Sequence, residues 1–340
     1  DGRITLANYA AMFARLRFRR AAFGSVLLAC GSASLSTLLG LIIALAAWKT
    51  TLPLRRLFAV AAVIPIIIPG FVNSLAYIFL FGRNGLITHK LLNLDWQIYS
   101  WRSVLILQTL GLTTTTFHLL SAMLSGVWSQ VEDAARNLGA GEWEVLTTAT
   151  LPLIRPGLIS ALLLAFLRSM ADFGTPIIVG GGFTTLATTS YTQLIGTYDT
   201  GMASTLNVVL LVFSLIVFWF YTRLQRGFAG TVQVQSGSGG RKPLHLSKPI
   251  KAGIWTVGMA FSVLVFTLLA SVFLSAFTKH LGADFALTLD HFRILPQRGW
   301  NSTRNTLVFA TVTSFTTSLL GIVTAYLVNR GDFAGRTWLD

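Results

Sequence analysis

Charge is scarce in this 340-residue chain, and acidic residues are the scarcest of all. Only 11% of the residues are charged, 53% are hydrophobic, and 12 Asp and Glu stand against 26 Lys and Arg. A soluble chain of this length needs about a quarter of its residues charged to cover its surface. The composition therefore excludes an ordinary soluble enzyme and predicts a polytopic membrane protein.

Cysteine and ligand motifs are equally sparse. The single Cys30 lies in an apolar run, so the chain can form no intrachain disulfide. His118, His280 and His291 are isolated along the chain and lack the spacing of metal ligands. The phosphate-loop spacing G-x-x-x-x-G-K-[ST] occurs nowhere, which excludes a Walker-type ATP site in this chain.

The net charge of +14 would suggest nucleic acid as a partner if the protein were soluble. Here the basic residues lie between apolar runs, as expected for loops that face anionic lipid headgroups. The cluster Arg15–Arg20 is interpreted as such a surface, or as a contact for an acidic binding protein. The sequence predicts the lipid bilayer, and no nucleic acid, as a partner.

Several apolar stretches are long enough to cross a bilayer, since a helical span needs about 20 mostly apolar residues. They are expected to be helices, because a lone strand cannot satisfy its backbone in lipid. The seven stretches run roughly over 23–48, 57–82, 103–121, 157–178, 204–222, 252–277 and 304–328. The fold class predicted is therefore all-α, with Pro65 and Pro69 kinking the second span.

The chain repeats part of itself. Ser36–Leu45 aligns with Thr317–Tyr326, and Ile4–Tyr9 resembles Leu287–Phe292 at nearly the same offset. Repeated units are a common construction of transporters. We expect a first unit over 1–226, a Gly/Ser-rich basic linker over 227–250 that acts as a flexible tether, and a second unit over 251–340. The repeat also leads us to expect one span before Asp1 and a continuation of the second unit beyond Asp340.

The loop between the third and fourth spans has helical periodicity. Its apolar positions repeat at one-face spacing: Leu124, Val127, Trp128, Val131, Ala134, Ala135 and Leu138. Gly139 and Gly141 are predicted to break this helix, and Glu142 and Glu144 to open a short second one. Pro152 and Pro156 are predicted to end that second helix and start the fourth span. This pattern indicates either an amphipathic hairpin on lipid or a rigid elbow for a soluble partner. Loop charges favour only weakly the orientation that places this loop inside the cell.

Two opposite charges fall inside the fourth span. Arg168 and Asp172 lie four residues apart, hence on one helix face. They are interpreted either as a mutually satisfied pair or as the polar lining of a pathway or gate. Gly174 and Pro176 are predicted to end this helix, and a helix broken within the membrane lines a cavity.

Asn73 of the second span is a further candidate, for packing between helices or for lining the pathway. The pathway candidates are thus Arg168, Asp172, Gly174, Pro176 and Asn73. A lone carboxylate such as Asp172 is a poor iron ligand set, so no metal site is predicted.

At this loop the sequence resembles a known family. Glu132, Asp133, Ala134 and Ala135, followed by Gly139 and then by Leu151 and Pro152, resemble the coupling-loop motif of ATP-binding-cassette importer permeases. Asp133 replaces the Ala of that motif, and Thr113–His118 lacks a proline that relatives often carry. Ala171–Pro176, followed by Gly180–Gly182, resembles the ferric-iron branch, whose permeases fuse two units in one chain.

The resemblance implies the transmembrane domain of a type I importer in a bacterial inner membrane. It implies that the elbow docks on separate ATPase subunits that hold ATP and Mg, that Glu132 and Asp133 meet a basic residue there, and that Gly139 sets the corner angle. A periplasmic binding protein would deliver ferric iron, and the chain itself would carry no catalytic residue and no cofactor. Polyamine, thiamine or phosphonate are alternative cargoes, and a secondary transporter or channel without an ATPase is an alternative of another class.

Overall fold

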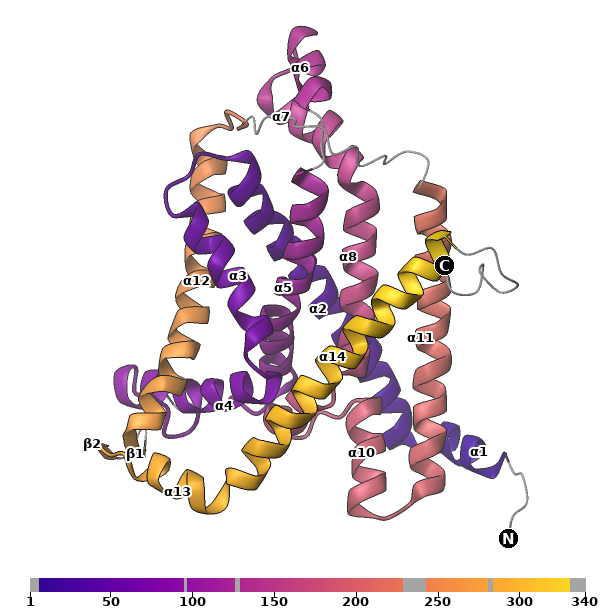
Figure 1. Ribbon diagram of the computed structural model, residues 1–340, viewed down its shortest axis with the longest axis vertical. Coiled ribbons are helices and arrows are strands. Elements are labelled where there is room, and N and C mark those ends of the chain that lie inside the picture. The colour runs from indigo at the N-terminus through magenta and orange to yellow at the C-terminus, as the bar shows by residue number, and fades with distance from the viewer. Residues whose placement is uncertain (1–5, 95–96, 126–128, 229–242, 281–283, 331–340) are drawn as a thin grey trace. The chain divides into compact units, whose positions relative to one another are not determined.

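The computed structural model describes residues 6–94, 97–125, 129–228, 243–280 and 284–330. The chain divides into two compact units, Asp1–Phe273 and Leu274–Asp340. The first unit holds α1 (Ala7–Ala14), α2 (Leu16–Lys49), α3 (Arg55–Ile67), α4 (Gly70–Phe81), α5 (Trp101–Ser125), α6 (Ser129–Asn137), α7 (Glu142–Glu144), α8 (Leu151–Ala171), α9 (Gly174–Val179), α10 (Leu186–Gly196), α11 (Thr200–Phe228) and most of α12 (Lys248–Phe277) (Figure 1). Single π-helical turns occupy Leu86–Leu91 and Val145–Thr150.

Within the described residues, six helices are long and apolar enough to cross a membrane. They are Leu16–Lys49, Trp101–Ser125, Glu142–Ala171, Thr200–Gln225, Lys248–Phe277 and Trp300–Val328. The pair Arg55–Ile67 and Gly70–Leu91 would make a seventh span, although it is bent by 111°. The seven predicted spans therefore correspond to these helices and the bent pair, and in the described part of the chain the regular structure is helical apart from two short strands.

The second span is broken rather than kinked. Ile68 is extended and Pro69 caps α4, so the chain turns between α3 and α4 instead of continuing along one axis. Proline disfavours helix at the residue before it, and Gly70 adds backbone freedom at the turn. The expectation of a simple proline kink was wrong at this point.

The fourth span is longer than predicted at the end that follows the elbow. Pro152 and Pro156 do not end the second helix of the elbow, because helical structure runs from Glu142 to Ala171. A π-helical turn over Val145–Thr150 precedes Pro152, and the Leu151 N–H donates to the Leu146 carbonyl five residues back. We infer that this widened turn relieves the clash between a proline ring and the preceding turn.

The centre of the first unit is the packing of α2 against α5. At Gly40 an added Cβ would lie 2.9 Å from the backbone nitrogen of Phe117, so only glycine fits there. The Thr116 hydroxyl donates to the Ser36 carbonyl at 2.7 Å, and the Thr113 hydroxyl to the Thr109 carbonyl at 2.6 Å. Thr113 thus bonds back to a carbonyl of its own helix, which can bend a helix mildly.

The segment 243–247 packs onto the first unit, while residues 229–242 lie outside the described part of the chain. Leu244 and Leu246 are buried, and the Leu244 N–H donates to the Lys49 carbonyl at 2.8 Å. The flexible-tether interpretation is therefore wrong for this end of the predicted linker. The boundary between the two compact units falls after Phe273, whereas the sequence repeat places the boundaries of the linker at 226 and 250. The division of the chain by the repeat stays a prediction.

The second unit consists of the end of α12, the antiparallel strands β1 (Thr278–His280) and β2 (Asp284–Leu287), α13 (Asp290–Arg298) and α14 (Trp300–Arg330). The ring of Phe292 contacts that of Phe277, and His291 bonds to the Thr278 carbonyl at 3.0 Å. The order of a short helix followed by a long one matches α1 and α2, as the repeat would require.

Candidate functional site

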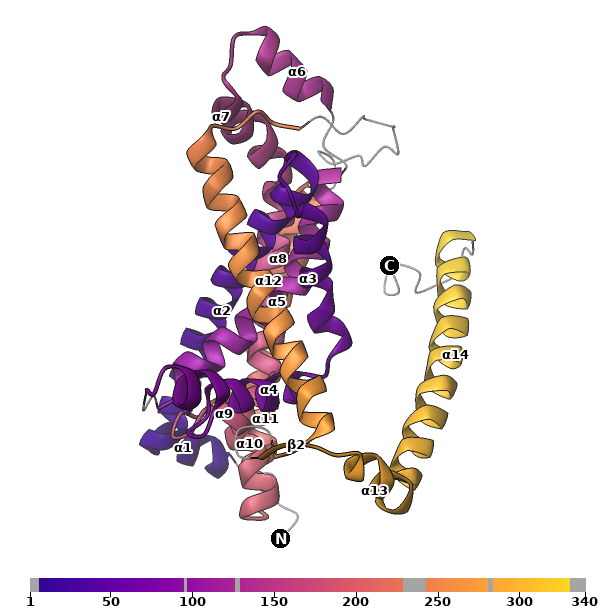
Figure 2. The same cartoon turned by 90° about the vertical axis from the view of Figure 1, so that its left-hand side faces the viewer.

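The loop between α5 and α8 forms a corner at one end of the first unit, opposite to α10 (Figures 1 and 2). α6 ends at Asn137, and Gly139 has a φ of +91°, which favours glycine over every other residue. The backbone N–H of Gly141 donates to the Glu144 carboxylate at 2.9 Å and starts α7. The predicted helix–glycine–helix elbow is confirmed for residues 129–144.

Glu132 lies at the inner side of this elbow and is fully buried. Its Oε1 accepts a hydrogen bond from Lys49 Nζ at 2.6 Å and another from the Thr150 hydroxyl at 2.8 Å. Lys49 is the last residue of α2, and Thr150 directly precedes α8. One carboxylate thus ties the elbow to two membrane helices, while Oε2 has no partner among the described residues.

This position of Glu132 corrects the sequence-based interpretation. Glu132 was expected to meet a basic residue on a partner, but the structure turns it toward Lys49 of its own chain. Asp133 is only half-buried, and its carboxylate bonds to Arg136 at 3.1 Å. The sequence signal was insufficient because Lys49 lies 83 residues away and carries no motif that pairs it with Glu132.

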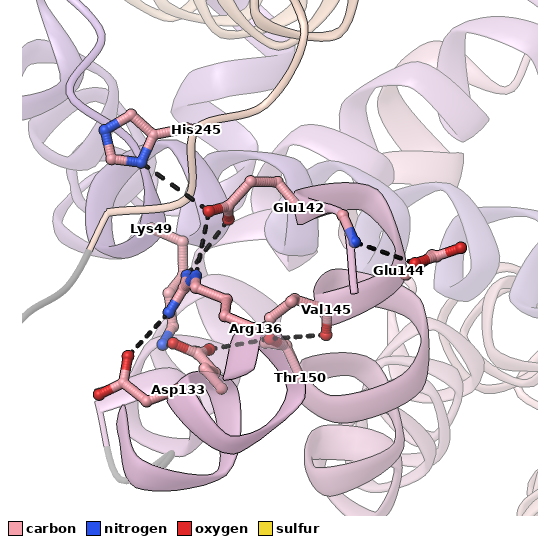
Figure 3. Close-up of polar contacts among 10 residues, drawn as sticks. Lys49, Asp133, Arg136, Glu142, Glu144, Val145, Thr150 and His245 are labelled. Carbon is pink, nitrogen blue, oxygen red and sulfur yellow. Dashed lines mark hydrogen bonds and ion pairs between the residues drawn. The ribbon is translucent and has the colours of Figure 1, made fainter. Parts of the chain in front are cut away.

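A second set of charges closes the corner between α6 and α7 (Figure 3). The Arg136 guanidinium donates to both oxygens of Glu142, with Nε–Oε1 at 3.0 Å and Nη2–Oε2 at 3.2 Å. This hydrogen bonding holds the pKa of the Glu142 carboxyl below its usual range and raises the pKa of Arg136. His245 Nδ1 lies 3.9 Å from Glu142 Oε1, so the segment after the linker reaches the same corner.

The outer face of the elbow is apolar and exposed. Leu138 is 89% exposed, Trp143 55% and Val131 40%. Ala134 is exposed and Ala135 half-buried, whereas Leu124 is buried and Val127 and Trp128 lie outside the described residues. At the start of α8, Leu151 is half-buried and Pro152 exposed. A group of large exposed apolar side chains is typical of a surface that another protein or a membrane covers.

At the other end of α8, Asp172 belongs to a polar network that joins three helices. Its Oδ2 accepts from Gln108 Nε2 at 2.9 Å, and its Oδ1 accepts from the Thr175 N–H at 3.2 Å. The Ser169 hydroxyl donates to Gln108 Oε1 at 2.6 Å, and the Ser32 hydroxyl donates to Ser169 at 2.9 Å. The network spans α2, α5 and α8.

The fourth span breaks earlier than predicted. α8 ends at Ala171, Asp172 is extended with a ψ of 114°, and α9 begins at Gly174. Gly174 and Pro176 therefore lie inside α9 rather than ending α8, and the Asp172 carboxylate accepts the Thr175 N–H in the first turn of the new helix. The prediction of a break in this span is confirmed, and its position is corrected.

Arg168 and Asp172 do not form the ion pair that their spacing allowed. Arg168 is exposed and donates from Nη1 to the Thr115 hydroxyl at 3.1 Å. Within the described residues it contacts no carboxylate, since Asp172 has left the helical geometry that would bring the two together. The interpretation as a mutually satisfied pair was wrong, and the interpretation as a polar lining stays a prediction.

Asn73 borders a small cavity between α3, α4, α5 and α12. It is half-buried beside Pro65, Leu107 and Leu268, and these neighbours are apolar. The described residues contain no group of three His, Cys, Asp or Glu side chains that could hold a metal ion. Sequence reasoning missed four polar residues that build the elbow and the network: Lys49, Gln108, Arg136 and Thr150.

Comparison with known proteins places these features in a wider context. The sequence profile described as "Binding-protein-dependent transport system inner membrane component" matches residues 36–230. The ferric transport system permease protein FbpB of Actinobacillus pleuropneumoniae is 31% identical over 330 residues, covering 90% of this chain and 46% of that protein. A putative FbpB of Haemophilus influenzae is 31% identical over 320 residues, with 90% and 50% covered. This chain thus spans about half the length of these ferric relatives.

Shorter relatives and solved structures are also similar. The molybdenum transport permease ModB of Escherichia coli is 30% identical over 193 residues, covering 54% of this chain and 83% of ModB. The crystal structure of a bacterial ABC transporter that imports the acidic polysaccharide alginate matches with a TM-score of 0.56 and 18% identity, covering 66% of this chain and 85% of that chain. The same transporter type, solved with an alginate-bound periplasmic protein, matches with a TM-score of 0.55 and 17% identity, covering 66% and 84%. At this identity the two structures show a shared fold.

Proposed function

Because this chain belongs to the family of binding-protein-dependent transport system inner membrane components, multi-pass proteins of the bacterial inner membrane, we propose that it works as permease of an ATP-driven importer of ferric iron. The cargo is carried over from the two FbpB relatives, which cover nearly all of this chain. The chain is a transport subunit, and hydrolysis of ATP with Mg falls to separate ATPase subunits. A periplasmic binding protein delivers the cargo.

The elbow is the observation that carries this proposal. Its outer face exposes Val131, Leu138 and Trp143, which gives a soluble ATPase an apolar surface to cover. Its inner face is fixed to the membrane helices, since Glu132 bonds to Lys49 and Thr150. A partner that moves the elbow would therefore move α2 and α8 with it.

The continuous helix from Glu142 to Ala171 supports a route for this movement. At 30 residues, it reaches about 45 Å from the elbow to the Asp172 network. Helices transmit displacement along their axis because each turn is hydrogen-bonded to the next. We propose that Asp172, Gly174 and Pro176, where this helix breaks, form the gate that responds to the ATPase, with Arg168 and Asn73 on the pathway.

The decisive experiment is reconstitution of the full-length permease with its ATPase and binding protein in lipid vesicles. We expect the ATPase to copurify with the permease, and ⁵⁵Fe to accumulate only when ATP and the iron-loaded binding protein are present. Accumulation without ATP would favour a secondary transporter or channel. ATP-driven uptake of polyamine, thiamine or phosphonate in place of iron would retain the permease and correct the cargo.

A further inference from the structure

One face of α5 is polar in the middle of the membrane helix. Gly111, Thr115 and His118 follow at spacings of four and three residues, which places them on one side of the helix. Thr115 is half-buried and His118 exposed, while nothing lies within 4 Å of a Cβ added at Gly111. The neighbouring Thr114, Thr116 and Phe117 are buried against other helices. This face therefore looks away from the packed core of the unit.

Arg168 of α8 completes this face, and we call the four residues Gly111, Thr115, His118 and Arg168 the polar strip. Arg168 is exposed, and its guanidinium donates to the Thr115 hydroxyl at 3.1 Å. Within the described residues no carboxylate neutralises it. Asp172 is already bonded to Gln108 and to the Thr175 N–H, so it does not serve as a counter-charge.

The polar strip cannot face lipid. An arginine at membrane depth is costly in hydrocarbon and therefore faces protein or water. Arg168 lies in the last turn of α8, but its guanidinium reaches Thr115 in the middle of α5, so its charge lies at the depth of that membrane helix and not at its end. A strip of hydroxyl, imidazole and guanidinium that runs along two adjacent spans suits the wall of an aqueous passage.

The chemistry of the strip does not suit bare ferric iron. Hard cations take oxygen ligands such as carboxylates, and the strip has none. A guanidinium instead repels a trivalent cation and binds carboxylate or phosphate oxygens, which match its planar set of donors. The strip therefore presents donors for an anion along the route that a cation is proposed to take.

We propose that the polar strip lines the cargo passage and recognises an oxyanion, so that iron crosses as a complex whose outer atoms are carboxylate or phosphate-type oxygens. This inference rests on the proposed function, since it concerns the same passage. Arg168 contacts the oxyanion directly, and Thr115 holds the guanidinium in place. His118 adds a second nitrogen donor one turn along α5.

The experiment uses the reconstituted full-length importer and iron-loaded binding protein that carries ³²P-phosphate or ¹⁴C-citrate with ⁵⁵Fe. We expect one of the two anions to enter with iron in an ATP-dependent way. Arg168→Gln should lower entry of both labels by roughly tenfold, the loss expected for one charge-assisted contact. Arg168→Lys should retain most of the transport, and Arg56→Gln, which alters an exposed arginine at the start of α3, should leave it unchanged.

His118→Asp provides a second test if Arg168→Gln fails to assemble. A carboxylate in the strip should lower anion entry while the amount of assembled complex stays the same. Two results would overturn the inference: iron that enters without either anion, and iron that enters at the normal rate in Arg168→Gln. Entry of iron without either anion would assign Arg168 to pairing with another protein surface. Vesicles that import labelled molybdate or sulfate but no iron would contradict the ferric cargo and support the strip as an oxyanion site.

Discussion

Among single residues, Glu132 has the most demanding environment in the elbow. Its carboxylate is fully enclosed, and Lys49 and Thr150 supply both of its hydrogen bonds. An ion pair taken out of water gains stability only when its geometry is good, and loss of one partner leaves an uncompensated charge. The pair is therefore better understood as a device that fixes where α6 sits than as a source of net stability.

Lys49→Met should destabilise the elbow by roughly 3–5 kcal/mol, because it strands the buried carboxylate of Glu132. The double variant Lys49→Met/Glu132→Leu should lose less stability than Lys49→Met alone, since no charge is then left buried without a partner. Thermal unfolding in detergent of the wild type, the two single variants and the double variant measures the coupling energy between the two residues. Arg56→Met, at an exposed position, serves as the control and should change the stability very little. If the stability lost in the double variant equals the sum of the losses in the two single variants, Lys49 and Glu132 do not interact directly.

Glu142 should make the corner sensitive to acid. Its pKa is lowered by hydrogen bonding from Arg136, so its contribution to stability is complete above the ordinary glutamate value of about 4.3 and is lost as the pH falls through the lower folded-state value. A spin label at Leu138→Cys, in a Cys30→Ser background, should thus become mobile only when the pH falls below the ordinary titration range of a glutamate. Glu142→Gln should give a mobile label at every pH, and a transition between pH 5 and 8 would show that another group controls the corner.

At the scale of elements, the elbow depends on a backbone that only glycine adopts without strain. Gly139 has a φ of +91°, and open space surrounds its missing Cβ, so a substitution is opposed by the backbone rather than by neighbours. Gly139→Asp should cost roughly 1–2 kcal/mol locally and change the angle between α6 and α7. We expect ATP hydrolysis to continue in the reconstituted importer while iron uptake falls.

Gly182→Asp offers a matched control, since that glycine also has open space but lies outside the elbow. Equal losses of hydrolysis and uptake in Gly139→Asp would indicate failed assembly instead of uncoupling. Normal uptake would show that the corner angle does not matter for transport.

The elements differ in how far local sequence determines them. The helix–glycine–helix elbow was predictable because apolar spacing, Gly139 and the acidic start of α7 are all local signals. The continuation of α8 through Pro152 was not, since it depends on a π-helical turn that proline rules do not anticipate. The inward direction of Glu132 and the separation of Arg168 from Asp172 were also not predictable, because Lys49, Thr115 and Gln108 come from distant parts of the chain.

At the scale of the whole molecule, the elbow and α10 lie at opposite ends of the first unit. Lysines and arginines in the loops hardly distinguish the two sides, so the structure needs an independent test of orientation. Labelling of introduced cysteines provides such a test, because Cys30 is the single cysteine of this chain and one substitution removes it.

We expect Tyr198→Cys, 84% exposed next to α10, to react with a membrane-impermeant maleimide added from the periplasm. Leu138→Cys, 89% exposed on the elbow, should react only after the inner membrane is opened. Both variants carry Cys30→Ser, and that parent without cysteine gives the background. The reverse pattern would place the elbow outside the cell and exclude its contact with an ATPase.

Lys49 also links parts of the chain that the ribosome makes at very different times. Its side chain bonds to Glu132, 83 residues later, and its carbonyl accepts the N–H of Leu244, later still. During synthesis α2 must therefore wait at the membrane surface with its terminal lysine unpaired until the elbow emerges. The order of translation thus becomes an order of assembly, in which the segment around Leu244 completes a corner that α2 began.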